Sequence, residues 1–178
     1  MKDQYSFRVK IMHAALACMI LSVFTVGSLL TLIPEALQDI SYMLHKSIGI
    51  CIFFLMLLRL YFIHQDGRIT LPSEMARWDK VLARSVQYSL YLVLILMPLS
   101  GWLMSCASDH TPSFFGLFAL PCPGLHKNPA LAEFMGSAHY CIAWIIGGLL
   151  SLHILGSLKH YFYDKDNVLQ SMWSFKMK

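Results

Sequence analysis

Four long apolar stretches dominate this chain of 178 residues, at about residues 11–33, 40–63, 85–107 and 134–158. At a rise of about 1.5 Å per residue, each stretch would cross a hydrocarbon core of roughly 30 Å as a helix. Only 13% of the residues are charged, whereas a soluble domain carries roughly 25%. The stretches therefore predict an all-α integral membrane protein built as a four-helix bundle.

The segments between these stretches are too short for a second domain, and no Pro-rich or Ser-rich linker separates them. We therefore treat residues 1–178 as one membrane domain. The first stretch follows Arg8 and Lys10, as the core of a secretory signal would. Its 23 residues exceed the roughly 7 to 15 of such a core, and no clear A-x-A cleavage site follows. We expect the first stretch to stay attached.

The distribution of Lys and Arg predicts the orientation. With four spans, the two termini and the middle loop share one side of the membrane, and the other two loops share the opposite side. Of the 14 Lys and Arg residues, only Lys46 and Lys127 fall on the second side. Because cytoplasmic loops carry an excess of these residues, we predict that both termini are cytoplasmic. The net charge of +4 then reflects topology and lipid head groups, so it indicates no nucleic-acid partner.

Several kinds of chemistry lack a motif in this sequence. G-x-x-x-x-G-K-[ST], G-x-G-x-x-G and H-E-x-x-H are absent, which disfavours nucleotide and zinc-protease chemistry. The absence of C-x-x-C-H argues against covalent c-type haem. Cys18, Cys51 and Cys141 lie within apolar stretches, as small apolar residues do. Cys106 and Cys122 lie at or beyond the outer surface, where we favour free thiols over a disulfide.

The informative residues are four histidines within or at the edge of the apolar stretches: His13, His45, His139 and His153. An ionisable side chain at membrane depth is costly and indicates function by default. His139 and His153 are 14 residues apart, so they share one helix face at a separation of about 21 Å. This separation suits two stacked cofactors, since the ligands of a single zinc ion must converge within a few ångströms.

Each of these histidines needs a second ligand at its own depth. His45 and His139 each lie six residues beyond the acidic residue that opens their span on the outer side, so their depths match. His13 and His153 lie near the inner ends of their spans, with depths that match within about 4.5 Å. Two such pairs across a four-helix bundle predict two b-type haems, each iron bound by two neutral imidazoles.

The alternative for any one of these histidines is a hydrogen bond that joins two helices without a cofactor. His160 competes with His153, because it lies seven residues further along and faces nearly the same way. It follows Lys159, however, and is expected in the inner head-group layer. The remaining histidines lie in loops, where we expect them to be solvated: His64, His110 and His126.

Two basic residues accompany the histidines. Arg59 lies 14 residues after His45, on the same helix face and at the depth of the inner pair, where it would meet haem propionates. The alternative is an arginine that extends to the inner surface. Lys46 would bind outer propionates in the same way. In the third span, Pro98 and Gly101 indicate a kink and a close approach by a neighbour or a cofactor, but no obvious ligand.

Five groups of residues along the chain form a recognisable pattern. They are Tyr5 and Ser6 before His13; His45 with Gly49 and Arg59; L-M-P-L-S-G at 96–101; Leu152 before His153; and H-Y-F-Y-D-K-D-N at 160–167. Through them nearly the whole chain resembles the bacterial diheme cytochrome b561 family, in particular its superoxide oxidase members. Carried over residue by residue, the family's axial ligands pair His13 with His153 and His45 with His139, which agrees with the depth argument. Ala14 stands where the family usually has Trp, and the outer loop around 121–123 is individual.

The resemblance implies an oxidoreductase that transfers electrons between superoxide and ubiquinone through two haem b groups in the bacterial inner membrane. Its partners would be membrane lipid, quinone and superoxide. The residues alone indicate transmembrane electron transfer, outer-sphere because both axial positions are filled, with no catalytic side chain identified. Two alternatives remain: a quinol-linked cytochrome b subunit that exchanges electrons with another periplasmic partner, and a non-redox four-helix membrane protein.

Overall fold

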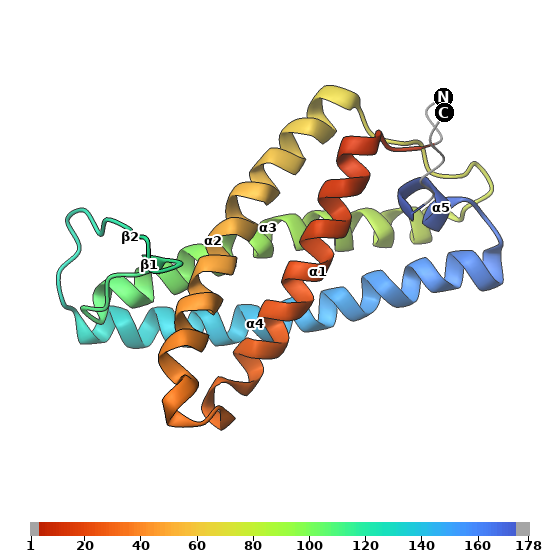
Figure 1. Ribbon diagram of the computed structural model, residues 1–178. Coiled ribbons are helices and arrows are strands. Elements are labelled where there is room, and N and C mark those ends of the chain that lie inside the picture. The colour runs from red at the N-terminus through yellow and green to blue at the C-terminus, as the bar shows by residue number, and fades with distance from the viewer. Residues whose placement is uncertain (1–3, 174–178) are drawn as a thin grey trace.

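Four long helices make up most of the computed structural model, which describes residues 4–173. They are α1 (Phe7–Leu29), α2 (Glu35–Asp66), α3 (Arg77–Ala107) and α4 (Pro129–Lys159), as Figure 1 shows. Each helix is long and apolar enough to cross a membrane. The predicted all-α membrane fold of four helices is confirmed.

Local features at the ends of α2 and α4 help to fix where these two helices begin and end. Glu35 places a negative charge in the first turn of α2, where it interacts favourably with the helix dipole. The helix ends at Asp66, and the next residue, Gly67, has a positive φ of 74°. At the start of α4, the side chain of Asn128 accepts a hydrogen bond of 3.1 Å from the backbone N–H of Leu131. Pro129 follows as the first helical residue, a position that needs no N–H donor.

Short elements complete the described chain. A 3₁₀ turn, η1 (Leu30–Leu32), ends the first span, and a π-helical turn, η2 (His160–Asp164), leads from α4 to the short helix α5 (Val168–Trp173). The strands β1 (Ser113–Phe114) and β2 (Phe118–Ala119) form an antiparallel hairpin between α3 and α4. The hairpin is fixed to α2, because the fully buried hydroxyl of Ser47 accepts a hydrogen bond of 2.8 Å from the backbone N–H of Phe115.

The long helices pack as two pairs that cross obliquely (Figure 1). Helix α1 lies along α2, helix α3 lies along α4, and α2 also contacts α3. Among the described residues, α4 makes no extended backbone contact with either α1 or α2. The backbones are therefore held apart on the side where α4 faces the first pair, and side chains or a bound group must fill that space.

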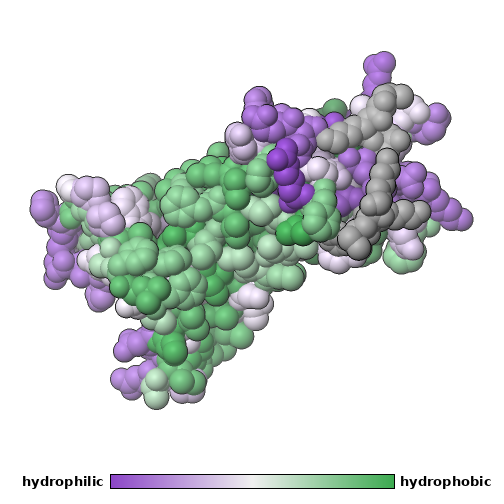
Figure 2. Space-filling view, turned by 45° about the horizontal axis from the view of Figure 1, so that its top comes forward, coloured by the Kyte–Doolittle hydropathy of each residue, from purple (hydrophilic) through white to green (hydrophobic). Residues whose placement is uncertain are grey.

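The two ends of the bundle differ. We call the end at which α1 joins α2 and α3 joins α4 the outer end, following the predicted orientation, and the opposite end the inner end. At the inner end, Asp66 accepts hydrogen bonds from Ser6 and Arg8, which ties α2 to the start of α1. Figure 2 shows a broad hydrophobic surface between polar ends. Many large apolar side chains of the long helices are exposed, among them Phe54, Trp144 and Leu155, as expected where lipid replaces water.

A disulfide joins Cys106, near the end of α3, to Cys122 in the outer loop. The expectation of two free thiols was therefore wrong. The loop returns to the end of α3 because its hairpin is fixed to α2 and because the backbone N–H of Asn128 donates to the carbonyl of Ala107 at 2.9 Å. The remaining cysteines are free, as expected: Cys18, Cys51 and Cys141.

Candidate cofactor site

The structure brings the four histidines of the spans together as two pairs. The ring centroids of His45 on α2 and His139 on α4 are 6.2 Å apart, and those of His13 on α1 and His153 on α4 are 6.1 Å apart. These are the pairs that the depth argument matched. Both pairs bridge the side of the bundle where α4 stands away from the first helix pair.

The separations leave room for a metal ion between the rings of each pair. Two metal–nitrogen bonds of about 2.0 Å on opposite sides of one ion, together with the two ring radii, place the centroids roughly 6 Å apart. Among the hydrogen bonds of the described chain, none joins the two rings of either pair. Each pair can therefore present one nitrogen from each side to a shared ion.

The outer pair is oriented by the third helix. Nδ1 of His139 lies 3.2 Å from the backbone carbonyl of Met97 and 3.0 Å from the hydroxyl of Ser100. The Ser100 hydroxyl donates to the same Met97 carbonyl at 2.8 Å. We assign the proton of His139 to Nδ1, where it donates to these oxygens, so that Nε2 keeps its lone pair for a metal. Sequence reasoning missed Met97 and Ser100, although both lie within the L-M-P-L-S-G motif.

Two glycines make space for the outer rings. A Cβ atom on Gly101 would lie 3.0 Å from Cε1 of His139, and one on Gly27 would lie 2.8 Å from Cε1 of His45. Carbon atoms this close would clash, so a side chain at either position would displace the ring. The expected close approach at Gly101 is confirmed, and the partner that approaches is His139. Gly27 was missed, although it is the only glycine of α1, since glycine is common in membrane helices for packing alone.

The inner pair lies beside a buried positive charge. Arg59 is 6% exposed and lies close enough to His13 and His153 to interact electrostatically with both rings. Its guanidinium carbon lies 5.7 Å from the ring centroid of Tyr91. Within residues 4–173, no carboxylate forms an ion pair with Arg59. A buried charge without a partner costs several kcal/mol, so an anion is needed at this place.

Four buried polar atoms around the pairs have no hydrogen-bond partner in the described chain: Nδ1 of His13, Nδ1 of His45, Nε of Arg59 and the hydroxyl of Tyr91. Buried polar groups are almost always satisfied in native proteins. Facing imidazoles, unpaired donors and an unpaired buried cation together fit a flat iron cofactor that carries carboxylates. The residues present therefore fit haem.

Lys46 occupies the corresponding place at the outer end, beside His45. Its ammonium group donates to the hydroxyl of Ser105 at 2.8 Å. That hydroxyl has its own proton committed to the backbone carbonyl of His110 at 2.7 Å, so it accepts from Lys46. These bonds fix the lysine against the end of α3, with part of its side chain still exposed. Its charge remains available to an anion that approaches from the outer end.

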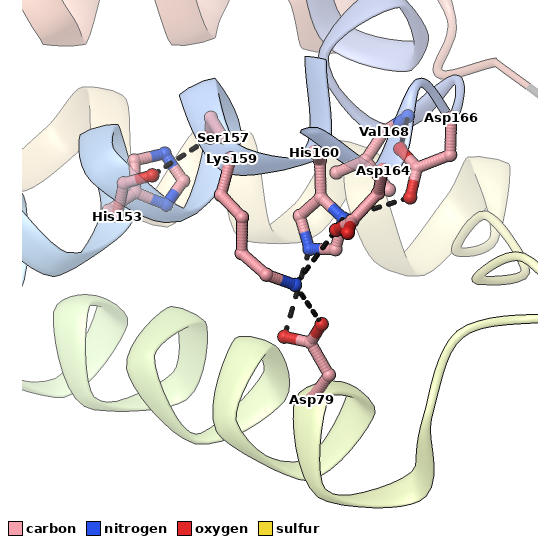
Figure 3. Close-up of polar contacts among 8 residues, drawn as sticks. All are labelled: Asp79, His153, Ser157, Lys159, His160, Asp164, Asp166 and Val168. Carbon is pink, nitrogen blue, oxygen red and sulfur yellow. Dashed lines mark hydrogen bonds and ion pairs between the residues drawn. The ribbon is translucent and has the colours of Figure 1, made fainter. Parts of the chain in front are cut away.

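His160 stands apart from His153, as Figure 3 shows. Its Nδ1 lies 2.8 Å from a carboxylate oxygen of Asp166 and 2.9 Å from one of Asp164. On the other side of the ring, Nε2 lies 3.9 Å from an oxygen of Asp79 on α3. These acidic neighbours hold the ring at the inner end of α4. Of the two rivals for the inner pair, the structure places His153 and not His160 opposite the first helix.

The same carboxylates also bind Lys159. Its ammonium group lies 2.6 Å from Asp79 and 2.8 Å from Asp164, so it bridges α3 and the turn after α4 (Figure 3). Ligand atoms of Asp79, His160 and Asp164 are close enough to hold a metal ion. The ammonium forms an ion pair with each of these two carboxylates, and the cluster joins the inner ends of α3 and α4.

Comparison with known proteins places these features in a family context. Residues 4–175 match the family model described as prokaryotic cytochrome b561. The chain is 36% identical over 130 residues to cytochrome b561 homolog 2 of Escherichia coli strain K12, which covers 72% of this chain and 68% of the relative. It is 26% identical over 128 residues to cytochrome b561 homolog 1 of the same organism, which covers 72% of each protein.

Proposed function

The chain belongs to the prokaryotic cytochrome b561 family, and we propose that it carries two haem b groups and transfers electrons from superoxide to ubiquinone. Family membership makes it a membrane haem protein with a role in electron transfer. It also removes the non-redox alternative, in which the histidines only join helices. The proposal adds to family membership the number of haems, the electron donor and the electron acceptor.

The observation that carries the proposal is the pair of facing imidazoles at each of two depths. His45 and His139 would hold the outer haem iron, and His13 and His153 the inner one. Haem supplies a centre that gains and loses one electron at a time. If two imidazoles held each iron, they would leave no coordination position for a substrate, and these histidines would restrict the protein to outer-sphere transfer.

The charged residues have matching roles in this proposal. Arg59 would neutralise propionates of the inner haem, and Lys46 would do so at the outer haem or attract superoxide to it. The net charge of the outer loops as a whole does not favour an anion, because four acidic residues outnumber two lysines. The acidic residues are Glu35, Asp39, Asp109 and Glu133, and the lysines are Lys46 and Lys127. Attraction of superoxide would therefore depend on the local field of Lys46, fixed beside His45.

The proposed reaction balances with two molecules of superoxide for each ubiquinone. Each superoxide gives up one electron and leaves as oxygen, and the quinone takes two electrons and two protons to become quinol. We place the outer end in the periplasm and both termini in the cytoplasm of a bacterial inner membrane, on the strength of the Lys and Arg distribution. Membrane lipid surrounds the apolar surface of the bundle.

The test is rapid mixing of detergent-solubilised holoprotein with superoxide and a soluble ubiquinone. We expect fast haem reduction and superoxide-dependent quinol formation, both slowed by Lys46→Glu because the local field is reversed. The matched control is Lys127→Glu, which reverses the charge of the other outer lysine, an exposed residue in the loop before α4. Haem that stays oxidised under a superoxide flux, yet is readily reduced by quinol, would instead support the quinol-linked cytochrome b subunit.

A further inference from the structure

The positive charges beside the two histidine pairs differ in burial, and would therefore affect the two haems differently if each pair holds one as proposed. Arg59 is buried at the inner pair without a carboxylate partner in residues 4–173. Lys46 at the outer pair is only partly buried. A charge interaction is about fourfold stronger at an effective dielectric constant of about 20 than in water, and salt screens exposed charges further. Arg59 therefore acts on its site more strongly than Lys46 does.

The hydrogen bonds to the histidine rings also differ between the two pairs. His139 donates from Nδ1 to the carbonyl of Met97 and to Ser100. Such a bond makes the imidazole a more basic ligand, which stabilises the oxidised metal. The Nδ1 atoms of His13 at the inner pair and of His45 at the outer pair both have no hydrogen bond, so the ring hydrogen bonds that distinguish the outer pair are those of His139. Ligand hydrogen bonding thus favours the oxidised state at the outer site, whereas Arg59 favours an added electron at the inner site.

Tyr91 completes the inner environment. Its ring lies against the Arg59 guanidinium, at 5.7 Å from the guanidinium carbon to the ring centroid, and the residue is only 8% exposed. The amide of Gln87 is near, but the hydroxyl of Tyr91 completes no hydrogen bond. The ring confines the guanidinium by a cation–π contact. The unpaired O–H group adds a dipole that can turn toward a negative charge.

From these observations we propose that Arg59, positioned by Tyr91, makes the inner site the higher-potential site of the two, so that an electron delivered at the outer end moves inward. In this transfer one electron would pass from the outer site to the inner site, which would oxidise the outer site and reduce the inner one, and no bond or proton would change place. Arg59 and Tyr91 are positioning and electrostatic residues, because neither ligates the metal. The inference rests on the proposed binding of two haems.

A redox titration of the purified holoprotein, followed in the visible spectrum, tests the proposal. We expect two one-electron transitions. Arg59→Met should lower only the higher transition, by at least a tenfold change in electron partition, or about 59 mV. Tyr91→Phe should shift the same transition in the same direction by a smaller amount. Arg59→Lys, which keeps the charge, should shift it less than Arg59→Met does.

The matched control is Arg68→Met. Arg68 also lies over a tyrosine, at 4.6 Å from the ring centroid of Tyr88, but it is exposed. Its replacement should leave both transitions in place. A shift of the lower transition by Arg59→Met, or of neither transition with haem content intact, overturns the proposal.

A second measurement does not depend on changing Arg59. His45→Ala should lose the outer haem and keep the inner one, and the remaining transition should be the higher of the two. A remaining transition that matches the lower one overturns the order of potentials but leaves the diheme proposal standing. A wild-type chain that binds fewer than two haems overturns the diheme proposal and the order together.

Discussion

The two histidine pairs have nearly the same geometry but different surroundings. Their centroid separations are 6.2 and 6.1 Å, and in both pairs one ring comes from α4. The outer rings lie in notches made by glycines, and one of them, His139, is oriented by neutral hydrogen bonds. The inner rings lie beside a buried guanidinium and a tyrosine. Ligand identity alone therefore does not define a site, since the surrounding groups tune the metal.

The two sites should therefore be sensitive to different kinds of substitution. The outer site should be sensitive to added volume, because glycine is the only residue that leaves room for its rings. The inner site should be sensitive to the loss of positive charge. Arg59 lies buried beside its rings, and no carboxylate of the described residues forms an ion pair with it. Variants that alter one end and spare the other can break or sharpen the comparison.

The largest effect is expected from Gly27→Val. Its Cβ would lie 2.8 Å from Cε1 of His45, so the ring must move. Overpacking of this kind typically costs about 1–3 kcal/mol, which would weaken haem binding at the outer site roughly 5- to 150-fold. Haem content per chain, measured on purified protein, should fall from two toward one. Gly49→Val is the control, because a Cβ there meets nothing within 4 Å. Equal losses from both variants would show that the notch has no special role.

A smaller effect is expected from Ser100→Ala. The variant removes one oxygen beside Nδ1 of His139 and leaves the Met97 carbonyl in place. A hydrogen bond of this kind contributes about 0.5–1.5 kcal/mol, so both haems should remain bound. The lower redox transition should rise slightly while the higher one stays constant. A shift of the higher transition alone would contradict the assignment of Ser100 to the outer site.

Much of the bundle could be predicted because the decisive signals are local. An apolar stretch of sufficient length specifies a spanning helix by itself. The pairing of His45 with His139 needed only their distance from the ends of their spans, since all helices rise by the same amount per residue. The match of His13 with His153 required only an allowance for tilt.

Other features depend on how each helix is rotated about its axis, which the pattern of a single span does not determine. Gly27 faces His45 and Tyr91 faces Arg59 only because the helices pack in one particular rotation. The disulfide of Cys106 with Cys122 was missed for a related reason. The disulfide forms because a hairpin with two-residue strands is fixed to Ser47. No local sequence motif predicts this tertiary contact.

Haem content of the purified chain and its histidine variants tests the central claim most directly. Wild-type protein from haem-replete cells should contain two b-type haems per chain, both low-spin and six-coordinate. His139→Ala should remove the outer haem and leave the inner one largely in place, and His153→Ala should do the reverse. His126→Ala, in a loop, is the control and should keep both. A colourless wild-type protein, or unchanged haem content in all four single variants of His13, His45, His139 and His153, would contradict the account.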